Sequence, residues 1–213
     1  MAQKKYIVVE GPIGVGKTSL AKLLAAEFQA RTVFETVEDN PFLSKFYQDR
    51  ETYAFQNQLF FLLNRYQQQR DLIQRELFSQ TTVSDYLFAK DKIFASLTLS
   101  AEELALYHQI YQLLDPRLPR PDLVVYLQAR PDVLYKRLKK RDKSYERSVT
   151  LEYLTEVAQA YSQFFFHYDE SPLLVVNTSE IDFVASSQHL ADLVREINRM
   201  GPGTQHYIPL GSR

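Results

Sequence analysis

A glycine-rich segment near the start of the chain has the residue types and the spacing of a phosphate site. In order, it comprises Gly11, Pro12, Ile13, Gly14, Val15, Gly16, Lys17 and Thr18. Glycines let backbone N–H groups turn toward phosphate oxygens, and the N-terminus of a following helix adds a favourable dipole. We expect Lys17 to reach the terminal phosphates and Thr18 to hold a magnesium ion. The alternative is a tight glycine turn beside a buried lysine stem.

The residues on either side of this segment predict the context that a phosphate-binding P-loop needs. An apolar run at 6–9 precedes the segment and predicts a strand, whereas the amphipathic stretch 19–24 predicts a helix. Strand, glycine-rich turn and helix in this order favour nucleotide phosphate binding. Glycine is absent between residues 17 and 200, and the chain has no Asn-Lys-x-Asp motif. A GTPase is therefore not expected.

Two acids follow predicted strands and lie where a parallel sheet binds its ligands, at the carboxyl ends of its strands. Glu35 ends the run 31–35, and Asp85 ends the run 81–85. A carboxylate at Glu35 is suited to orient an acceptor hydroxyl and take its proton. Asp85 is suited to order a magnesium shell. The alternatives are a surface acid near a helix start for Glu35 and a helix cap for Asp85.

Two further groups have the chemistry to bind a nucleotide or nucleoside. Gln58 and Arg65 lie on one face of a predicted helix with Phe61 between them, and could bind a nucleobase. A solvated polar stripe is the alternative. Arg137 and Arg141 share a face in the basic run 136–143, and mobile arginines suit phosphoryl transfer. The alternative for this run is charge complementarity to a helix C-terminus.

The elements that must position these residues alternate along the chain. Apolar runs with strand character recur near 5–10, 32–35, 81–85, 122–128 and 173–177. Helical spacing is found near 17–29, 51–78, 101–114, 131–141, 150–169 and 182–199. This order predicts an α/β fold with a five-stranded parallel sheet and helices on both faces. We interpret Tyr126 and the run 164–166 as core or interface residues.

Composition limits the classes of protein that remain. The chain has 213 residues, of which 45% are hydrophobic, and we expect a single domain over 1–199 with a flexible tail at 200–213. A net charge of −1 offers no general attraction to nucleic acid or membrane, so neither is expected as a partner. The chain has no cysteine, which excludes disulfides and thiolate metal sites. Without a long apolar run, a cytoplasmic location is expected.

Taken together and in order, these motifs resemble the deoxynucleoside kinases, in particular the bacterial deoxyadenosine and deoxyguanosine kinases. The segment 35–42 is similar to the family segment that begins with the catalytic glutamate, so the resemblance implies that Glu35 is the base for the nucleoside 5′-hydroxyl. Gln58 and Arg65 match the family's base-reading pair. Tyr47 and Glu146 match the residues that contact the sugar 3′-hydroxyl. The segment from 177 to Asp182 and Phe183 resembles the loop beside the adenine of ATP.

The chain departs from the family pattern at two positions. Tyr86 follows Asp85 where family members carry an arginine. The resemblance implies that the bacterial purine-type branch shares this replacement, which removes one cation near the transferring phosphate. Lys143 replaces the last arginine of a segment that resembles the arginine-rich lid, and lysine cannot make the same bidentate contact. Lys17, Arg137 and Arg141 are left to compensate for the lost charge.

The resemblance implies a P-loop kinase fold and an ATP-dependent kinase for nucleotide salvage. ATP and Mg²⁺ would supply the phosphoryl group for the 5′-hydroxyl of a deoxyribonucleoside, with deoxyadenosine or deoxyguanosine favoured and deoxycytidine retained. A homodimer, or a dimer with a related kinase subunit, is implied as well. The alternatives are a nucleoside monophosphate kinase of the thymidylate kinase type and a non-catalytic nucleotide-binding subunit. The acidic and neutral residues on the acceptor side, among them Glu35 and Glu146, suit an uncharged nucleoside better than a monophosphate.

Overall fold

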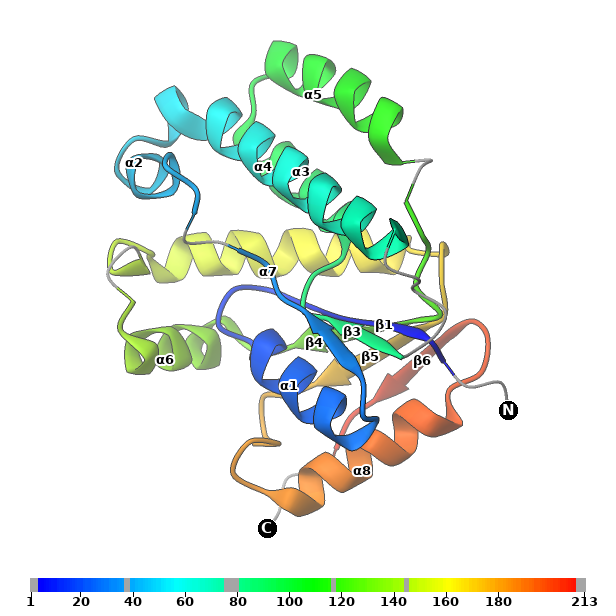
Figure 1. Cartoon of the computed structure of the whole chain (residues 1–213). Coiled ribbons are helices and arrows are strands. Elements are labelled where there is room, and N and C mark those ends of the chain that lie inside the picture. Colours follow the sequence, from blue (N-terminus) through cyan, green and yellow to red (C-terminus); the bar gives the residue numbers. More distant parts are fainter. Residues whose placement is uncertain (1–3, 37–38, 75–80, 116–117, 144–145, 210–213) are drawn as a thin grey trace.

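One parallel sheet runs through the chain and carries helices on both faces (Figure 1). The computed structural model describes residues 4–36, 39–74, 81–115, 118–143 and 146–209. The strands are β1 (Tyr6–Glu10), β2 (Arg31–Val33), β3 (Thr82–Ser84), β4 (Leu123–Gln128), β5 (Leu173–Asn177) and β6 (Thr204–Tyr207). Their order across the sheet is β2-β3-β1-β4-β5-β6, and every neighbouring pair is parallel. All five residues of β1 are buried, as a central strand covered on both faces requires.

The helices form layers on the two sides of this sheet. They are α1 (Lys17–Glu27), α2 (Leu43–Gln48), α3 (Arg50–Gln74), α4 (Asp91–Thr98), α5 (Ala101–Leu114), α6 (Pro131–Arg141), α7 (Leu151–Phe166) and α8 (Ser187–Arg199), with a 3₁₀ turn η1 at Phe88–Lys90. In Figure 1, α1 and α8 lie on one side, and α7 lies on the other with α3, α4 and α5 stacked beyond it. Among the described residues, no helix has the length and hydropathy of a membrane span.

Local sequence signals explain where several helices begin and end. Ser100 and Glu103 form a reciprocal capping box at the start of α5, and the Thr150 hydroxyl accepts a hydrogen bond from the backbone N–H of Tyr153 at the start of α7. Pro131 occupies the first turn of α6, where its missing N–H costs nothing. Asp142 ends α6 with a left-handed backbone, φ +46°.

Buried hydrophobic residues form two separate clusters, one around the sheet and one among α3, η1, α4 and α5. The larger packs around the sheet and includes Val8, Leu20 and Val125. The smaller comprises Leu62, Phe88, Ala95, Tyr107 and Tyr111, and it joins α3, η1, α4 and α5 to one another. Because α3 and α4 carry polar residues on their opposite side, this second cluster fixes those residues above the carboxyl edge of the sheet.

The buried carboxylate of Glu10 ties the end of β1 to two other elements. Its Oε1 accepts hydrogen bonds from the backbone N–H of Gly11, at 2.8 Å, and the hydroxyl of Tyr161, at 3.2 Å. Its Oε2 accepts from the backbone N–H of Leu87 at 2.7 Å. Glu10 thus joins the P-loop, α7 and the segment after β3 at one point.

The observed fold confirms the predicted α/β class, but the expected number of strands was wrong. The sheet has six strands, because β6 lies in the segment expected to be a flexible tail. Its residues Thr204, Gln205 and His206 are exposed and polar, so they gave no apolar signal. As an edge strand, β6 pairs with β5 alone through backbone hydrogen bonds. The core interpretation holds for Tyr126 and Phe165, which stack with ring centroids 4.1 Å apart, whereas Phe166 is exposed.

Replacing Glu10 with alanine is expected to lower the free energy of unfolding by about 2–4 kcal/mol, because it leaves several buried donors without an acceptor. Urea denaturation of the wild type and the variant measures the difference. Glu27, an exposed acid of α1, is the matched control, and Glu27→Ala is expected to change stability by less than about 0.5 kcal/mol. Equal unfolding midpoints for the two variants would contradict the role given to Glu10.

Candidate active site

A cavity of about 440 Å³ lies at the carboxyl edge of the sheet, between the P-loop and the helical layer. The predicted site residues that line it are Ile13, Gly14, Lys17, Thr18, Glu35, Tyr47, Gln58, Arg65, Asp85, Arg141 and Glu146. Lys90 and Lys143 line it as well. The structure therefore brings together the acids after β2 and β3, the polar face of α3, and the end of α6. Gly11, Pro12, Val15, Gly16, Arg137, Asp182 and Phe183 lie outside the lining that the described residues form.

Gly11 and Gly14 of the P-loop lie so close to neighbouring backbone that no side chain would fit. A Cβ atom on Gly11 would lie 2.4 Å from the carbonyl oxygen of Leu127, a contact that real side chains do not make. Gly14 has φ +83°, and a Cβ there would lie 2.9 Å from the carbonyl oxygen of Leu134. The loop thus follows β4 and α6 closely and ends at Lys17, the first residue of α1.

The side chain of Lys17 lies across its own loop. Its Nζ donates to the carbonyl oxygen of Gly11 at 2.7 Å and to that of Pro12 at 3.3 Å. Phosphate oxygens would replace these carbonyls as acceptors when a nucleotide binds.

Several charged groups face the ammonium of Lys17. Burial lowers the pKa of Lys17 to about 8, and the nearby ammonium of Lys90 contributes in the same direction. The carboxylates of Glu10, Glu35 and Asp85 oppose this shift. Without a bound anion, the ammonium is therefore less stable than that of an exposed lysine.

Thr18 and Asp85 form the group of hard oxygen donors at the P-loop. The Thr18 hydroxyl donates to Asp85 Oδ2 at 2.5 Å, and the backbone N–H of Glu35 donates to Asp85 Oδ1 at 2.8 Å. Asp85 thus contacts the P-loop helix and the end of β2. In the part of the chain that the structure describes, no side chain caps η1 or α4, so Asp85 is not the cap of the following helix. No cluster of three or more His, Cys, Asp or Glu side chains suited to a metal occurs in the described ranges. A hydroxyl and a carboxylate fit Mg²⁺ that takes its remaining ligands from phosphates and water.

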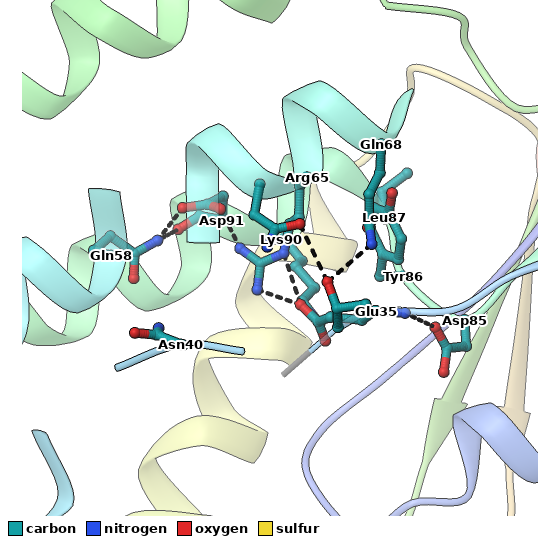
Figure 2. A network of polar contacts seen from close by, with 12 residues as sticks. Glu35, Asn40, Gln58, Arg65, Gln68, Asp85, Tyr86, Leu87, Lys90 and Asp91 are labelled. Carbon is teal, nitrogen blue, oxygen red and sulfur yellow. Dashed lines mark hydrogen bonds and ion pairs between the residues drawn. The ribbon is translucent and has the colours of Figure 1, made fainter. Parts of the chain in front are cut away.

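The carboxylate of Glu35 lies between two cations (Figure 2). Its Oε1 accepts from Nε of Arg65 at 2.7 Å, and its Oε2 accepts from Nζ of Lys90 at 2.7 Å. Only 13% of the Glu35 side chain is exposed, which contradicts the alternative of a surface acid. Burial alone would raise the pKa of this carboxyl, but Arg65 and Lys90 hold it well below its usual value. Glu35 is therefore ionised at neutral pH.

Gln58 and Arg65 meet at the carboxylate of Asp91, the first residue of α4 (Figure 2). The Gln58 amide donates to the backbone carbonyl of Asp91 at 2.9 Å and also to its Oδ1, while Arg65 pairs with Oδ2. The Tyr107 hydroxyl donates to Oδ1 at 3.3 Å. The guanidinium of Arg65 also lies over the ring of Phe61, 4.8 Å from its centroid. Since Gln58 and Arg65 are both buried, the alternative of a solvated stripe is wrong.

Lys90 and Asp91 are two site residues that the sequence analysis missed. Both are buried, and they are consecutive residues: Lys90 ends η1 and Asp91 begins α4. A buried arginine needs a carboxylate partner, so Arg65 signals that such an acid exists. The sequence does not show which acid it is, because pairing depends on how α3 packs against α4.

The basic run at the end of α6 has side chains in two different surroundings. Arg141 pairs with the buried carboxylate of Glu146, and both line the cavity together with Lys143. Arg137 instead holds the segment after β5. Its Nη2 donates to the carbonyl oxygen of Thr178 at 2.8 Å, and its Nη1 donates to the Thr178 hydroxyl at 3.2 Å.

The segment after β5 reaches the P-loop from the outside of the cavity. Phe183 is buried, and its ring would lie 3.1 Å from a Cβ on Gly16. Asp182 accepts hydrogen bonds from the backbone N–H groups of Val184 and Ala185, both at 2.9 Å, and so shapes its own turn. Residues 37–38, in the segment 35–42, lie outside the described residues. Residues 144–145, which follow the basic run 136–143, lie outside them as well.

Comparison with protein families gives one assignment. The model of the family described as deoxynucleoside kinase matches residues 7–200. The chain is 34% identical over 200 residues to a deoxyguanosine kinase of Bacillus subtilis (strain 168), covering 92% of this chain and 97% of that protein. It is 33% identical over 212 residues to a deoxyadenosine kinase of Dictyostelium discoideum, covering 93% of this chain and 84% of that protein.

Solved structures show the same fold. A deoxyadenosine kinase from M. mycoides with bound dATP matches with a TM-score of 0.77 at 22% identity, covering 90% of this chain and 98% of that one. A second structure of that kinase, with the products dCMP and dCDP, has a TM-score of 0.78 at 23% identity. It covers 91% of this chain and 98% of that one. The family model and the curated relatives do not favour a thymidylate kinase or a non-catalytic subunit. The chain belongs to the deoxynucleoside kinase family, and it is a phosphotransferase that phosphorylates deoxynucleosides.

Proposed function

We propose that this kinase transfers the γ-phosphoryl group of ATP to the 5′-hydroxyl of a purine deoxyribonucleoside. The observation that carries the proposal is the position of Glu35 in the cavity. On one side lie Gln58 and Arg65, which suit a base, and on the other lie Thr18 and Asp85, which suit metal-bound phosphates. A hydroxyl held between the two groups would face the carboxylate.

The reaction that this arrangement supports is a direct in-line displacement. The 5′-oxygen forms a bond to the γ-phosphorus as the bond from that phosphorus to the β–γ bridging oxygen breaks, and ADP leaves. The proton of the 5′-hydroxyl passes to Glu35. Because the pKa of Glu35 lies well below its usual value in the free protein, its main contribution is to align the hydroxyl. Lys17 and Arg141 stabilise the charge that develops on the phosphoryl oxygens.

The remaining lining residues suit the metal and the sugar. Thr18 and Asp85 would hold Mg²⁺, which supplies charge neutralisation on the β- and γ-phosphates when bound. Tyr47 and Glu146 line the same cavity and are proposed to contact the 3′-hydroxyl of the sugar.

The preference for a purine has the support of the relatives' names. They include deoxyguanosine and deoxyadenosine kinases, and a Bacillus subtilis relative at 27% identity is a deoxyadenosine/deoxycytidine kinase. Asp182 and Phe183 are proposed to flank the adenine of ATP, with Arg137 fixing their segment against Thr178. A dimer stays a prediction from the family resemblance.

A substrate panel tests the proposed function. With ATP and Mg²⁺, deoxyadenosine or deoxyguanosine is expected to give the 5′-monophosphate with the highest kcat/KM of the four common deoxyribonucleosides. Chromatographic detection of the monophosphate is the measurement, with thymidine monophosphate as an alternative acceptor. Phosphorylation of thymidine monophosphate in preference to every nucleoside would refute the proposal.

Substituting glutamine for Glu35 is expected to lower kcat by about 10²–10⁴-fold, because the amide can neither accept the proton nor align the hydroxyl as an anion. The nucleoside KM should change by less than about threefold. Steady-state kinetics measure both values. Glu51→Gln, at an exposed acid in the first turn of α3, is the matched control and should leave kcat unchanged. A Glu35→Gln enzyme with normal turnover would remove Glu35 from the reaction.

ATP binding is expected to weaken as the pH rises above about 8. The pKa of Lys17 is about 8 in the free protein, and bound phosphates would raise it. Below that pH the ammonium is present in both states, whereas above it binding requires proton uptake, so the dissociation constant should rise by up to about tenfold per pH unit. Calorimetric titration with a non-hydrolysable ATP analogue measures this. Lys17→Arg stays charged and should show a flat profile. An equally flat wild-type profile would contradict the assignment.

A further inference from the structure

Lys90 is a buried cation to which the reaction described above gives no role. It ends η1, directly before Asp91, and only 4% of its side chain is exposed. Its Nζ lies 2.7 Å from Oε2 of Glu35, and its side chain lines the cavity. Burying a lysine is costly unless the charge is compensated, so the position of Lys90 needs an explanation.

Arg65 and Lys90 hold the two oxygens of Glu35 in different ways. Arg65 also pairs with Asp91, and it therefore keeps a carboxylate partner when Glu35 turns to a substrate hydroxyl. The ion pair of Lys90 is with Glu35, on the oxygen that Arg65 does not contact. A hydroxyl that takes the place of Lys90 at this oxygen would leave the ammonium beside the attacking atom.

The surroundings show where that ammonium could act. Lys90 and Lys17 line one cavity, and their mutual repulsion contributes to the lowered pKa of Lys17. Tyr86, which directly follows Asp85, is fully buried and supplies no cation. An anion between Lys17 and Lys90 would relieve their repulsion, and a phosphoryl group in transit from ATP to the nucleoside is such an anion.

We propose that Lys90 is a catalytic residue whose ammonium contacts the phosphoryl group as it reaches the 5′-oxygen, on the side opposite Lys17. The inference rests on the proposed function. The proton of the hydroxyl still passes to Glu35, the new bond joins the 5′-oxygen to phosphorus, and ADP leaves. Lys90 stays protonated and stabilises the charge on the transferred oxygens and on the monophosphate product.

Kinetics of Lys90→Met test the proposal, because methionine keeps an unbranched side chain only one heavy atom shorter and removes its charge. We expect kcat to fall by about 100-fold, as for the loss of one donor to a transition-state oxyanion. The nucleoside KM should change by less than about threefold. Lys92→Met is the matched control, since Lys92 lies over the ring of Tyr111 and away from the cavity lining, and it should keep wild-type kcat. Lys90→Gln replaces the methionine variant if circular dichroism shows that the latter is unfolded.

A double-mutant cycle separates direct contact from positioning of Glu35. If Lys90 contacts the phosphoryl group, adding Lys90→Met to Glu35→Gln should lower kcat by at least about a further tenfold. The single variant should also bind the nucleoside 5′-monophosphate about tenfold more weakly, with nucleoside affinity nearly unchanged. Wild-type kcat in both Lys90 variants, or no further loss in the Glu35→Gln background, would overturn the proposal. Either result leaves the proposed function intact, because the wild-type substrate panel tests that separately.

Discussion

The ion pairs around the Glu35 carboxylate are the interaction on which the candidate active site depends. A partly buried carboxylate that stays ionised must be compensated by cations, since a buried anion without partners is costly. Arg65 from α3 and Lys90 from η1 provide that compensation, and each of them is buried as well. Three segments distant in the sequence must therefore converge before any one of these charges is stable.

Two kinds of packing bring those segments together. Around the sheet, the large hydrophobic cluster fixes the ends of β1 and β3, and with them the P-loop and Asp85. Beyond α7, the small cluster fixes α3 against η1 and α4, so that Arg65 and Gln58 reach Asp91. The cavity lies where the polar sides of these two bodies face each other. The side of the cavity that the P-loop forms depends on backbone geometry, and the opposite side depends on side-chain pairing.

The sequence predicted the parts of the site that local patterns determine. The P-loop is one continuous segment, and the chemistry of Glu35 and Asp85 follows from their place after strands that could be recognised. Lys90 and Asp91 were missed because their roles arise from the packing of α4 against α3, which leaves no local pattern. β6 was missed because an exposed edge strand needs no apolar residues. The different surroundings of Arg137 and Arg141 depend on where the segment after β5 lies, and spacing along α6 does not reveal that.

The small hydrophobic cluster that joins α3, η1, α4 and α5 has an evolutionary consequence. Substitutions among Leu62, Phe88 and Tyr107 would shift the helices that carry Gln58 and Asp91, while the glycine backbone of the P-loop rests on β4 and α6. Mutations in one of these two parts can therefore accumulate without altering the other. Under the proposed function, lineages could diverge in the nucleobase they accept by repacking one cluster, while the P-loop that would bind the triphosphate is inherited unaltered.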